Sequence, residues 1–385
     1  MRDILLPLPD GPRRYRPPAP PDLCRTAPPA SSRTAFAAAH VVADPAAAQL
    51  PGASAVLDWD ATLAFRRHLW SLGLGVADAM DTAQRGMGLD WAGARELITR
   101  SGAEARATGG RLACGAGTDQ LTTAEPSLAD VLLAYEEQIE VVEAAGAQVV
   151  LMASRALAKA ADGPEDYARI YGRLLAQTRR PVILHWLGTA FDPALEGYWG
   201  STDLDRAAAT VLRITEENAA QVDGIKISLL DADRETALRR ALPEGVRMYT
   251  GDDFHYPGLI LGDEQGFSDA LLGVFDPIAA HAATALQALD RGDTTAYRTV
   301  LEPTLPLARH LFAAPTRHYK TGVVFLAHLA GHQGEFTMVG GEQHSRGVRH
   351  LAELFRLAGD AGAFPDPDLA TARMGAFLTT KGYDT

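Results

Sequence analysis

The 385-residue sequence contains only two cysteines, Cys24 and Cys114. So few cysteines exclude a cysteine-rich zinc site and provide no framework of disulfide bonds. No run of about 18 apolar residues occurs, so the sequence predicts no membrane-spanning helix. The apolar stretch at the N-terminus is short and interrupted by prolines, unlike the continuous apolar region of a signal peptide. These absences predict a cytoplasmic protein with reduced cysteines.

The sequence also lacks a nucleotide-binding loop and an excess of positive charge. No GxGxxG motif follows the first apolar run and no GxxxxGK[ST] motif occurs, so no phosphate-binding loop is expected. The net charge is −12. An acidic chain argues against nucleic acid and anionic membranes as partners. Neither observation argues against a small-molecule substrate.

The sequence does contain a regular alternation of short apolar runs and helical patterns. Eight apolar runs are bounded by Gly, Pro or charged residues, as buried parallel strands are. They occupy residues 36–43, 75–80, 111–116, 147–152, 181–186, 222–227, 246–250 and 271–275. Helical patterns lie between them. Eight strand–helix units predict a closed (β/α)8 TIM barrel, with an open doubly wound sheet as the alternative.

Regions of different composition flank the predicted barrel, which we place at residues 36–277. Residues 1–35 are rich in Pro and Arg and predict an extended arm or partly ordered tail, which either has no role or packs on a neighbouring subunit. Residues 278–385 predict a C-terminal helical region. Its helices are expected at 278–291, 294–313, 318–331, 345–359 and 367–379.

A lysine interrupts the apolar segment VDGIKIS (222–228). Because side chains alternate along a strand, Lys226 and Ser228 are expected to face the barrel interior near its C-terminal end, where barrel enzymes hold their active sites. Burial lowers the pKa of a lysine, and a neutral amine attacks carbonyl carbons to form an imine. The alternative is a salt bridge from Lys226 to an aspartate of another strand: Asp78, Asp81 or Asp252.

The order of four segments resembles the family of dihydrodipicolinate synthase and N-acetylneuraminate lyase. The segments are PVILHWLG (181–188), VDGIKIS (222–228), MYTGDD (248–253) and DALLGVFDP (269–277). The resemblance implies a class I mechanism, in which Lys226 forms a Schiff base with a ketone or keto-acid for C–C cleavage, C–C formation or dehydration. It implies no cofactor besides this lysine, and a homodimer or homotetramer.

Departures from the family pattern modify these expectations. The proton-relaying tyrosine of the family falls on His185, which suits acid–base catalysis near neutral pH. The carboxylate-binding segment is replaced by AMDTAQRG (79–86), where Thr82 is a remnant and Asp81 would repel a carboxylate unless Arg85 or a metal compensates. We therefore favour a neutral polyol, a sugar-derived ketone or an aldol product as the substrate.

The predicted site thus consists of two catalytic and seven substrate-binding residues. The catalytic residues are Lys226 and His185. The substrate-binding residues are Asp81, Thr82, Arg85, Ser228, Asp252, Asp253 and His255. Two glycine-containing segments, 81–91 and 331–344, are candidate lids over the barrel mouth.

Two other functions remain open at this point. His185, Asp252 and His255 could hold a divalent metal with nitrogen and oxygen ligands, as in a metal-dependent sugar isomerase or aldolase. A barrel that binds a metabolite without catalysis is the other alternative.

Overall fold

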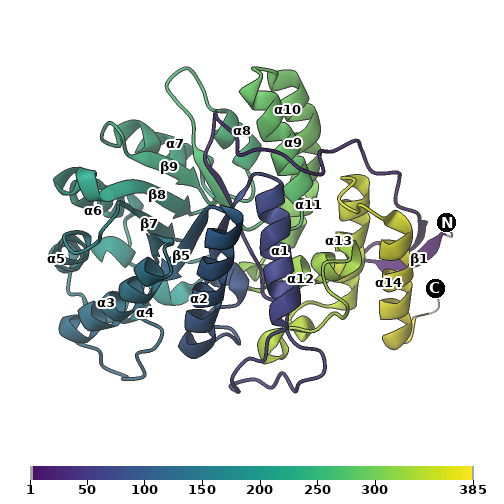
Figure 1. Ribbon diagram of the computed structural model, residues 1–385, viewed down its shortest axis with the longest axis horizontal. Coiled ribbons are helices and arrows are strands. Elements are labelled where there is room, and N and C mark those ends of the chain that lie inside the picture. Colours follow the sequence, from purple (N-terminus) through teal and green to yellow (C-terminus); the bar gives the residue numbers. More distant parts are fainter. Residues whose placement is uncertain (1–2, 384–385) are drawn as a thin grey trace.

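A closed barrel of eight parallel strands forms the centre of the computed structural model, which describes residues 3–383 (Figure 1). The strand order is β10-β3-β4-β5-β6-β7-β8-β9. The strands are β3 (Ala35–Ala38), β4 (Gly75–Asp78), β5 (Leu112–Ala116), β6 (Gln148–Leu151), β7 (Val182–Leu187), β8 (Val222–Ser228), β9 (Arg247–Thr250) and β10 (Asp269–Leu272). Each overlaps a predicted apolar run, although β3 ends five residues before its run does and β10 begins two residues before its run. The predicted TIM barrel is confirmed, and the open sheet is wrong.

Helices between the strands surround the barrel (Figure 1). They are α1 (Trp59–Ser71), α2 (Trp91–Thr108), α3 (Leu128–Ala144), α4 (Arg155–Ala160), α5 (Pro164–Leu175), α6 (Leu204–Glu217), α7 (Ala232–Ala241) and α8 (Tyr256–Leu261). Their starts follow the sequence signals: Asp58 caps α1, and Ser127 forms a capping box at α3. Helix α8 is short, because Gly262 ends it with a positive φ of 80°. Within residues 3–383, no helix is both long and apolar enough to cross a membrane.

The lower part of the barrel is filled with side chains. The inward-facing cluster contains Phe36, Ala38, Ala77, Met80, Ala113, Val150, Ile183, Tyr249 and Leu271. A barrel interior of this kind is a packed core rather than a channel. Any substrate must therefore bind above this cluster, at the C-terminal ends of the strands.

The C-terminal region is helical, as predicted. It comprises α9 (Ala279–Asp290), α10 (Thr294–Leu301), α11 (Leu305–Leu311), α12 (Tyr319–Ala330), α13 (Val348–Asp360) and α14 (Pro367–Thr380). The predicted helix 294–313 is divided into α10 and α11 around Pro303 and Pro306, because proline lacks the N–H that continues a helix.

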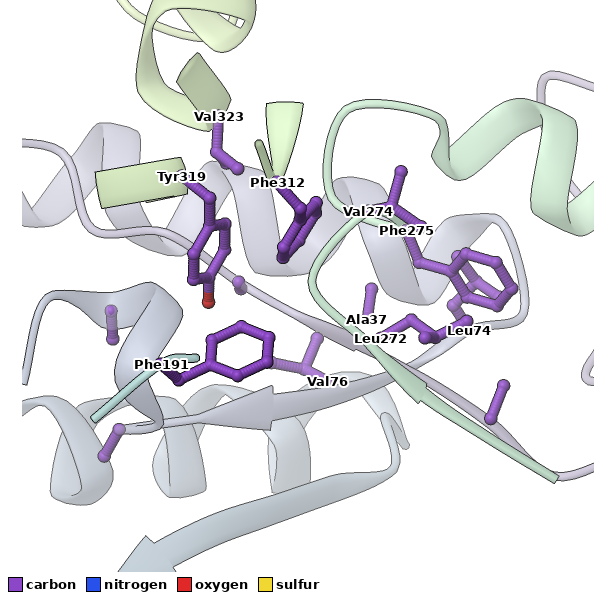
Figure 2. Packing of buried hydrophobic residues seen from close by; sticks show 14 of the residues in the cluster. Ala37, Leu74, Val76, Phe191, Leu272, Val274, Phe275, Phe312, Tyr319 and Val323 are labelled. Carbon is purple, nitrogen blue, oxygen red and sulfur yellow. The ribbon is translucent and has the colours of Figure 1, made fainter. Parts of the chain in front are cut away.

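Aromatic residues join this region to the barrel mouth. Figure 2 shows Phe312 and Tyr319 beside Phe191, which follows β7. The rings of Phe312 and Tyr319 are stacked with centroids 4.3 Å apart, and Tyr319 meets Phe191 edge-on at 6.1 Å. The start of α12 is thereby fixed over the open end of the barrel.

The N-terminal arm contains a hairpin that the sequence analysis did not predict. Strands β1 (Ile4–Leu8) and β2 (Gly11–Tyr15) pair antiparallel. The hairpin lies beside α13 and α14 (Figure 1), and the Tyr15 hydroxyl donates to the backbone oxygen of Arg356 at 3.0 Å. The arm therefore packs on its own chain. The division of the chain into arm, barrel and C-terminal region stays a prediction. Residues 1–2 of the arm and 384–385 of the C-terminal region lie outside the described residues.

A fully buried ion pair connects α1 to β4. Arg66 Nε and Nη2 donate to the two carboxylate oxygens of Asp78 at 3.1 and 2.8 Å, and the Ser101 hydroxyl adds a third bond at 2.6 Å. Neither charged side chain is exposed to solvent. Removing one partner of such a pair leaves an uncompensated buried charge.

We expect Arg66→Met to lower the free energy of unfolding by about 3–5 kcal/mol, since Asp78 would remain buried without its cation. The neighbouring Arg67 is the matched control. It pairs with Glu104 at the surface with 46% of its side chain exposed, so Arg67→Met should cost about 1 kcal/mol or less. Urea unfolding of both variants measures the difference; equal effects would contradict this account of the pair.

Candidate active site

Strands β7 and β8 place the predicted catalytic pair side by side. His185 is the register partner of Lys226, and Lys226 is the partner of Tyr249 on β9. Ile183 belongs to the cluster inside the barrel, so His185, two residues further along β7, lies above it on the same face. Ile225 and Ile227 instead belong to the outer core that packs against the helices. The predicted inward orientation of Lys226 agrees with this arrangement.

Lys226 is buried, with 5% of its surface exposed. Burial lowers the pKa of its ammonium group, and the negative charges of Asp81 and Asp253 offset this effect only in part. In the part of the chain that the structure describes, no carboxylate oxygen lies within 4.0 Å of the Lys226 amine.

The aspartates that could have held Lys226 in a salt bridge have other partners. Asp78 pairs with Arg66. Asp252 accepts bonds from the backbone N–H groups of Phe254 and His255 at 2.8 and 3.1 Å, and its other oxygen contacts His255 Nδ1 at 2.9 Å. The structure therefore agrees with an amine held by burial rather than by an ion pair.

Asp253 completes the surroundings of Lys226. Burial raises the pKa of Asp253 well above its usual range, although a hydrogen bond from the backbone N–H of Val274 and the charge of Lys226 both lower it. A raised carboxyl pKa and a lowered amine pKa favour the same state, in which neither group is charged. This state supplies both a nucleophile and a proton donor.

His185 is also uncharged in this environment. Burial, and then the positive charge of Lys226, lower the pKa of His185 well below its usual value. Its Nε2 lies 3.3 Å from the Ser228 hydroxyl, and its buried Nδ1 has no partner in residues 3–383. A neutral imidazole with one free ring nitrogen can accept or relay a proton.

Two hydroxyl groups connect the C-terminal region to the loop after β4 at the same end of the barrel. The Tyr319 hydroxyl bonds to the Thr82 hydroxyl and donates to Asp81 at 3.2 Å. Burial raises the pKa of Tyr319 well above its usual value, so it carries its proton at neutral pH. Asp81 and Thr82 follow β4, where Ala79 is held at a positive φ of 51°. Such backbone strain in a non-glycine residue is typical of functional sites.

A cavity of about 530 Å³ opens next to these residues. Asp81, His185, Phe191, Tyr319 and Lys320 line it. The cavity is large enough for a small metabolite. Lys226 lies beside His185 at the edge of this space rather than among the residues lining it.

Three predicted binding residues have structural contacts instead. Arg85 donates to Asp119 at 3.0 and 2.6 Å and to backbone oxygens of Ala79 and Gly115, so its guanidinium is fully engaged although it borders the cavity. Asp252 and His255 bond to each other and shape the turn after β9. Arg85 therefore has no free N–H group with which it could neutralise Asp81.

The alternative metal site is not brought together. No group of three or more His, Cys, Asp or Glu side chains across residues 3–383 is arranged to hold a metal ion. The proposed ligands His185, Asp252 and His255 therefore do not form a metal centre, because Asp252 directs its oxygens to its own turn and His255.

The sequence analysis missed Tyr319 and Lys320 as site residues. Both lie at the start of α12, far along the chain from the strand ends where barrel active sites are sought. Tyr319 follows a histidine and precedes an apolar helix, so no local signal distinguishes it. Only the packing of α12 over the barrel mouth shows its role.

The sequence model of a family described as protein of unknown function, DUF993, matches residues 4–383. The chain belongs to the DUF993 family. A search of curated proteins found no match to it.

Solved structures of dihydrodipicolinate synthases superimpose on this member of the DUF993 family over most of its length. The enzyme of Oceanobacillus iheyensis is 15% identical with a TM-score of 0.60, covering 91% of this chain and 98% of the enzyme. The enzyme of Bacteroides thetaiotaomicron is 17% identical with a TM-score of 0.62, covering 84% and 98%. YagE of E. coli K12 is a prophage protein of the dihydrodipicolinic acid synthase family whose structure is in complex with pyruvate. It is 13% identical with a TM-score of 0.64, covering 90% of this chain and 98% of YagE.

At this level of identity the similarity shows the fold alone. The resemblance predicted from the sequence is confirmed to that extent, and DUF993 is a divergent family with the dihydrodipicolinate synthase fold.

The glycine of the GDD turn has a specific steric role. A Cβ atom on Gly251 would lie 2.2 Å from Ser228 Oγ, 2.8 Å from the backbone oxygen of Ile227 and 2.8 Å from Lys226 Cε. Because the backbone oxygen cannot move freely, an alanine at this position must displace the lysine or the strand.

We expect Gly251→Ala to destabilise the protein by about 1–3 kcal/mol through overpacking and to slow reaction of Lys226 with carbonyl compounds. Gly258 is the matched control, because no atom lies within 4 Å of a Cβ added there. Thermal unfolding and mass-spectrometric trapping measure both effects. A Gly251→Ala protein that behaves like Gly258→Ala would overturn the steric assignment.

Proposed function

We propose that this chain is a class I aldolase or lyase that forms a Schiff base between Lys226 and a small ketone, keto-acid or sugar-derived substrate. The observation that carries the proposal is the amine itself. It is buried at the C-terminal end of a barrel strand, has a lowered pKa, and has no carboxylate within salt-bridge distance among residues 3–383. The fold shared with dihydrodipicolinate synthases supports this reading.

The surrounding groups can supply the proton transfers that imine formation requires. The neutral Lys226 amine attacks the carbonyl carbon, forming a C–N bond, and the carbonyl oxygen becomes a hydroxyl group. This hydroxyl leaves as water once it is protonated, and Asp253 is a suitable donor because burial raises its pKa and so favours its protonated form. The protonated imine then withdraws electrons from the bond that breaks or forms.

His185 and the Tyr319–Thr82–Asp81 chain lie where the rest of the substrate would bind. The neutral His185 can take a proton from the carbon or hydroxyl next to the imine. Asp81 and Thr82 are available to substrate hydroxyls. The predicted cytoplasmic location and homo-oligomeric state remain part of the proposal.

Lys226→Ala should abolish covalent trapping. After treatment of the protein with sodium borohydride and a panel of ketones, keto-acids and keto-sugars, we expect one adduct per chain, located on Lys226 by peptide mass spectrometry. Lys159→Ala is the control, because Lys159 lines the same cavity but is 51% exposed and paired with Glu125 at 2.9 Å. It should trap as well as the wild type. An adduct that persists in Lys226→Ala, or a wild type that turns over substrate without any adduct, would exclude the mechanism.

The pH dependence of trapping tests the burial argument directly. Only the neutral amine attacks, so the trapping rate should rise with pH and level off above the pKa of Lys226. Because burial lowers this pKa below the ordinary 10.5, the inflection should lie below that value. Cyanoborohydride trapping across alkaline pH measures it. An inflection at or above 10.5 would mean that an ion pair stabilises the ammonium form.

A further inference from the structure

A second buried lysine borders the same cavity. Lys320 is 4% exposed and lines the cavity from the first turn of α12. The sequence has only four lysines among its 36 Lys and Arg residues, and two of them, Lys226 and Lys320, are buried at this site. Lysine is therefore rare in this chain, and half of its lysines lie at this site.

Lys320 has no strong polar partner among residues 3–383. Its amine makes one hydrogen bond there, to Met87 Sδ at 3.5 Å, and no carboxylate of the described chain lies within 4.0 Å of it. Burial lowers its pKa to about 8, although Asp81 and Glu342 raise it. An ammonium group in the first turn of a helix is also next to the positive end of the helix dipole, which disfavours it. A buried cation in this position is stabilised when an anion binds to it.

Other cations surround the opening. Arg155, Lys159 and Arg317 line the same cavity. Arg155 and Lys159 are paired with Asp192 and Glu125, whereas Arg317 has no acidic partner in the described part of the chain. The two paired cations are neutralised by these carboxylates, so Arg317 is the cation that adds to the charge of Lys320 in the cavity lining, which favours entry of an anion.

Asp81 acts on both buried lysines. It is close enough to raise the pKa of both Lys226 and Lys320. An anionic group directly next to a carbonyl held at Lys226 would face Asp81 and be repelled. An anionic group further along the molecule would pass Asp81 and reach Lys320, with a hydroxyl between them as a partner for Asp81.

We propose that Lys320 determines substrate specificity by binding an anionic group, a carboxylate or a phosphate, at the end of the substrate remote from the carbonyl. This inference rests on the proposed function for the carbonyl end of the substrate. The substrate class is then a ketone or keto-sugar with a distal carboxylate or phosphate. This substrate class differs from the neutral polyol favoured from the sequence, because α12 adds the cation Lys320 to the site.

Direct binding of unreactive anions tests Lys320 without any imine chemistry. We expect calorimetric titration of the wild-type protein with succinate and with inorganic phosphate to show one site for at least one of them. Lys320→Gln should weaken it by about 10-fold or more, the loss of a charge-assisted hydrogen bond, whereas Lys320→Arg should retain most of the affinity. Lys381→Gln, which changes an exposed lysine outside the cavity lining, should stay within about 2-fold of the wild type. The tighter of the two ions identifies the anionic group.

The pH dependence in the wild type keeps the test independent of how the variants fold. Lys320 is protonated below its pKa of about 8, so affinity should be full at lower pH and fall as pH rises through and above that value. No binding of either anion below about 10 mM, or binding unchanged in a folded Lys320→Gln, would overturn the proposal.

Trapping with a matched pair of ketones tests both proposals together. It also distinguishes a failure of the Schiff-base function from a failure of the anion site. The pair is 4-oxopentanoate, which has a distal carboxylate, and 2-pentanone, which has none. Lys320→Gln should raise the concentration for half-maximal trapping of 4-oxopentanoate by about 10-fold and leave that of 2-pentanone unchanged. Equal effects on both would overturn the role of Lys320. If the wild type traps neither ketone but still binds the anion through Lys320, the Schiff-base function fails and the anion site stands.

Discussion

The removal of the Lys226 amine from water is the constraint on which the proposed chemistry depends. An inward-facing position at the end of a barrel strand is dry because the layer below it, which includes Ile183 and Tyr249, is closely packed. The side chain fits there only because Gly251 leaves room beside its Cε atom. A lysine in such a place loses part of its preference for the charged form, and the amine gains reactivity toward carbonyl carbon.

The distribution of ion pairs around the barrel keeps this amine free. Asp78 is satisfied by Arg66, Asp119 by Arg85, and Asp252 by its own turn and His255. None of these three carboxylates forms a salt bridge with Lys226. Asp253 is buried as well, and burial raises its pKa. Burial thus shifts the pKa values of Lys226 and Asp253 in the directions that favour their uncharged forms.

The C-terminal helices contribute more than additional core. Stacking of Phe312 on Tyr319, and contact of both rings with Phe191, fixes the start of α12 above the strands (Figure 2). This packing places a hydroxyl against Thr82 and a second amine at the cavity. The site therefore contains Asp81 from the loop after β4 and the cation Lys320 from a distant part of the chain.

Local patterns in the amino-acid sequence were sufficient to predict the barrel, its eight strands and the inward position of Lys226 and His185, because strand and helix periodicity are local properties that burial enforces. It also indicated the turn after β9 through GDD. The hairpin of residues 4–15 escaped prediction because its Pro- and Arg-rich composition resembles a tail, and its pairing is stabilised by contact with α13.

Which polar residues at the strand ends are free and which are engaged depends on how distant parts of the chain pack together. Arg85 and Lys320 are both cations in the sequence, but hydrogen bonds to Asp119 and to backbone oxygens occupy Arg85. Lys320 instead lines the cavity, and within residues 3–383 its amine bonds only to a sulfur atom. Partners this far apart in the chain are selected by packing, which local patterns of residues do not encode.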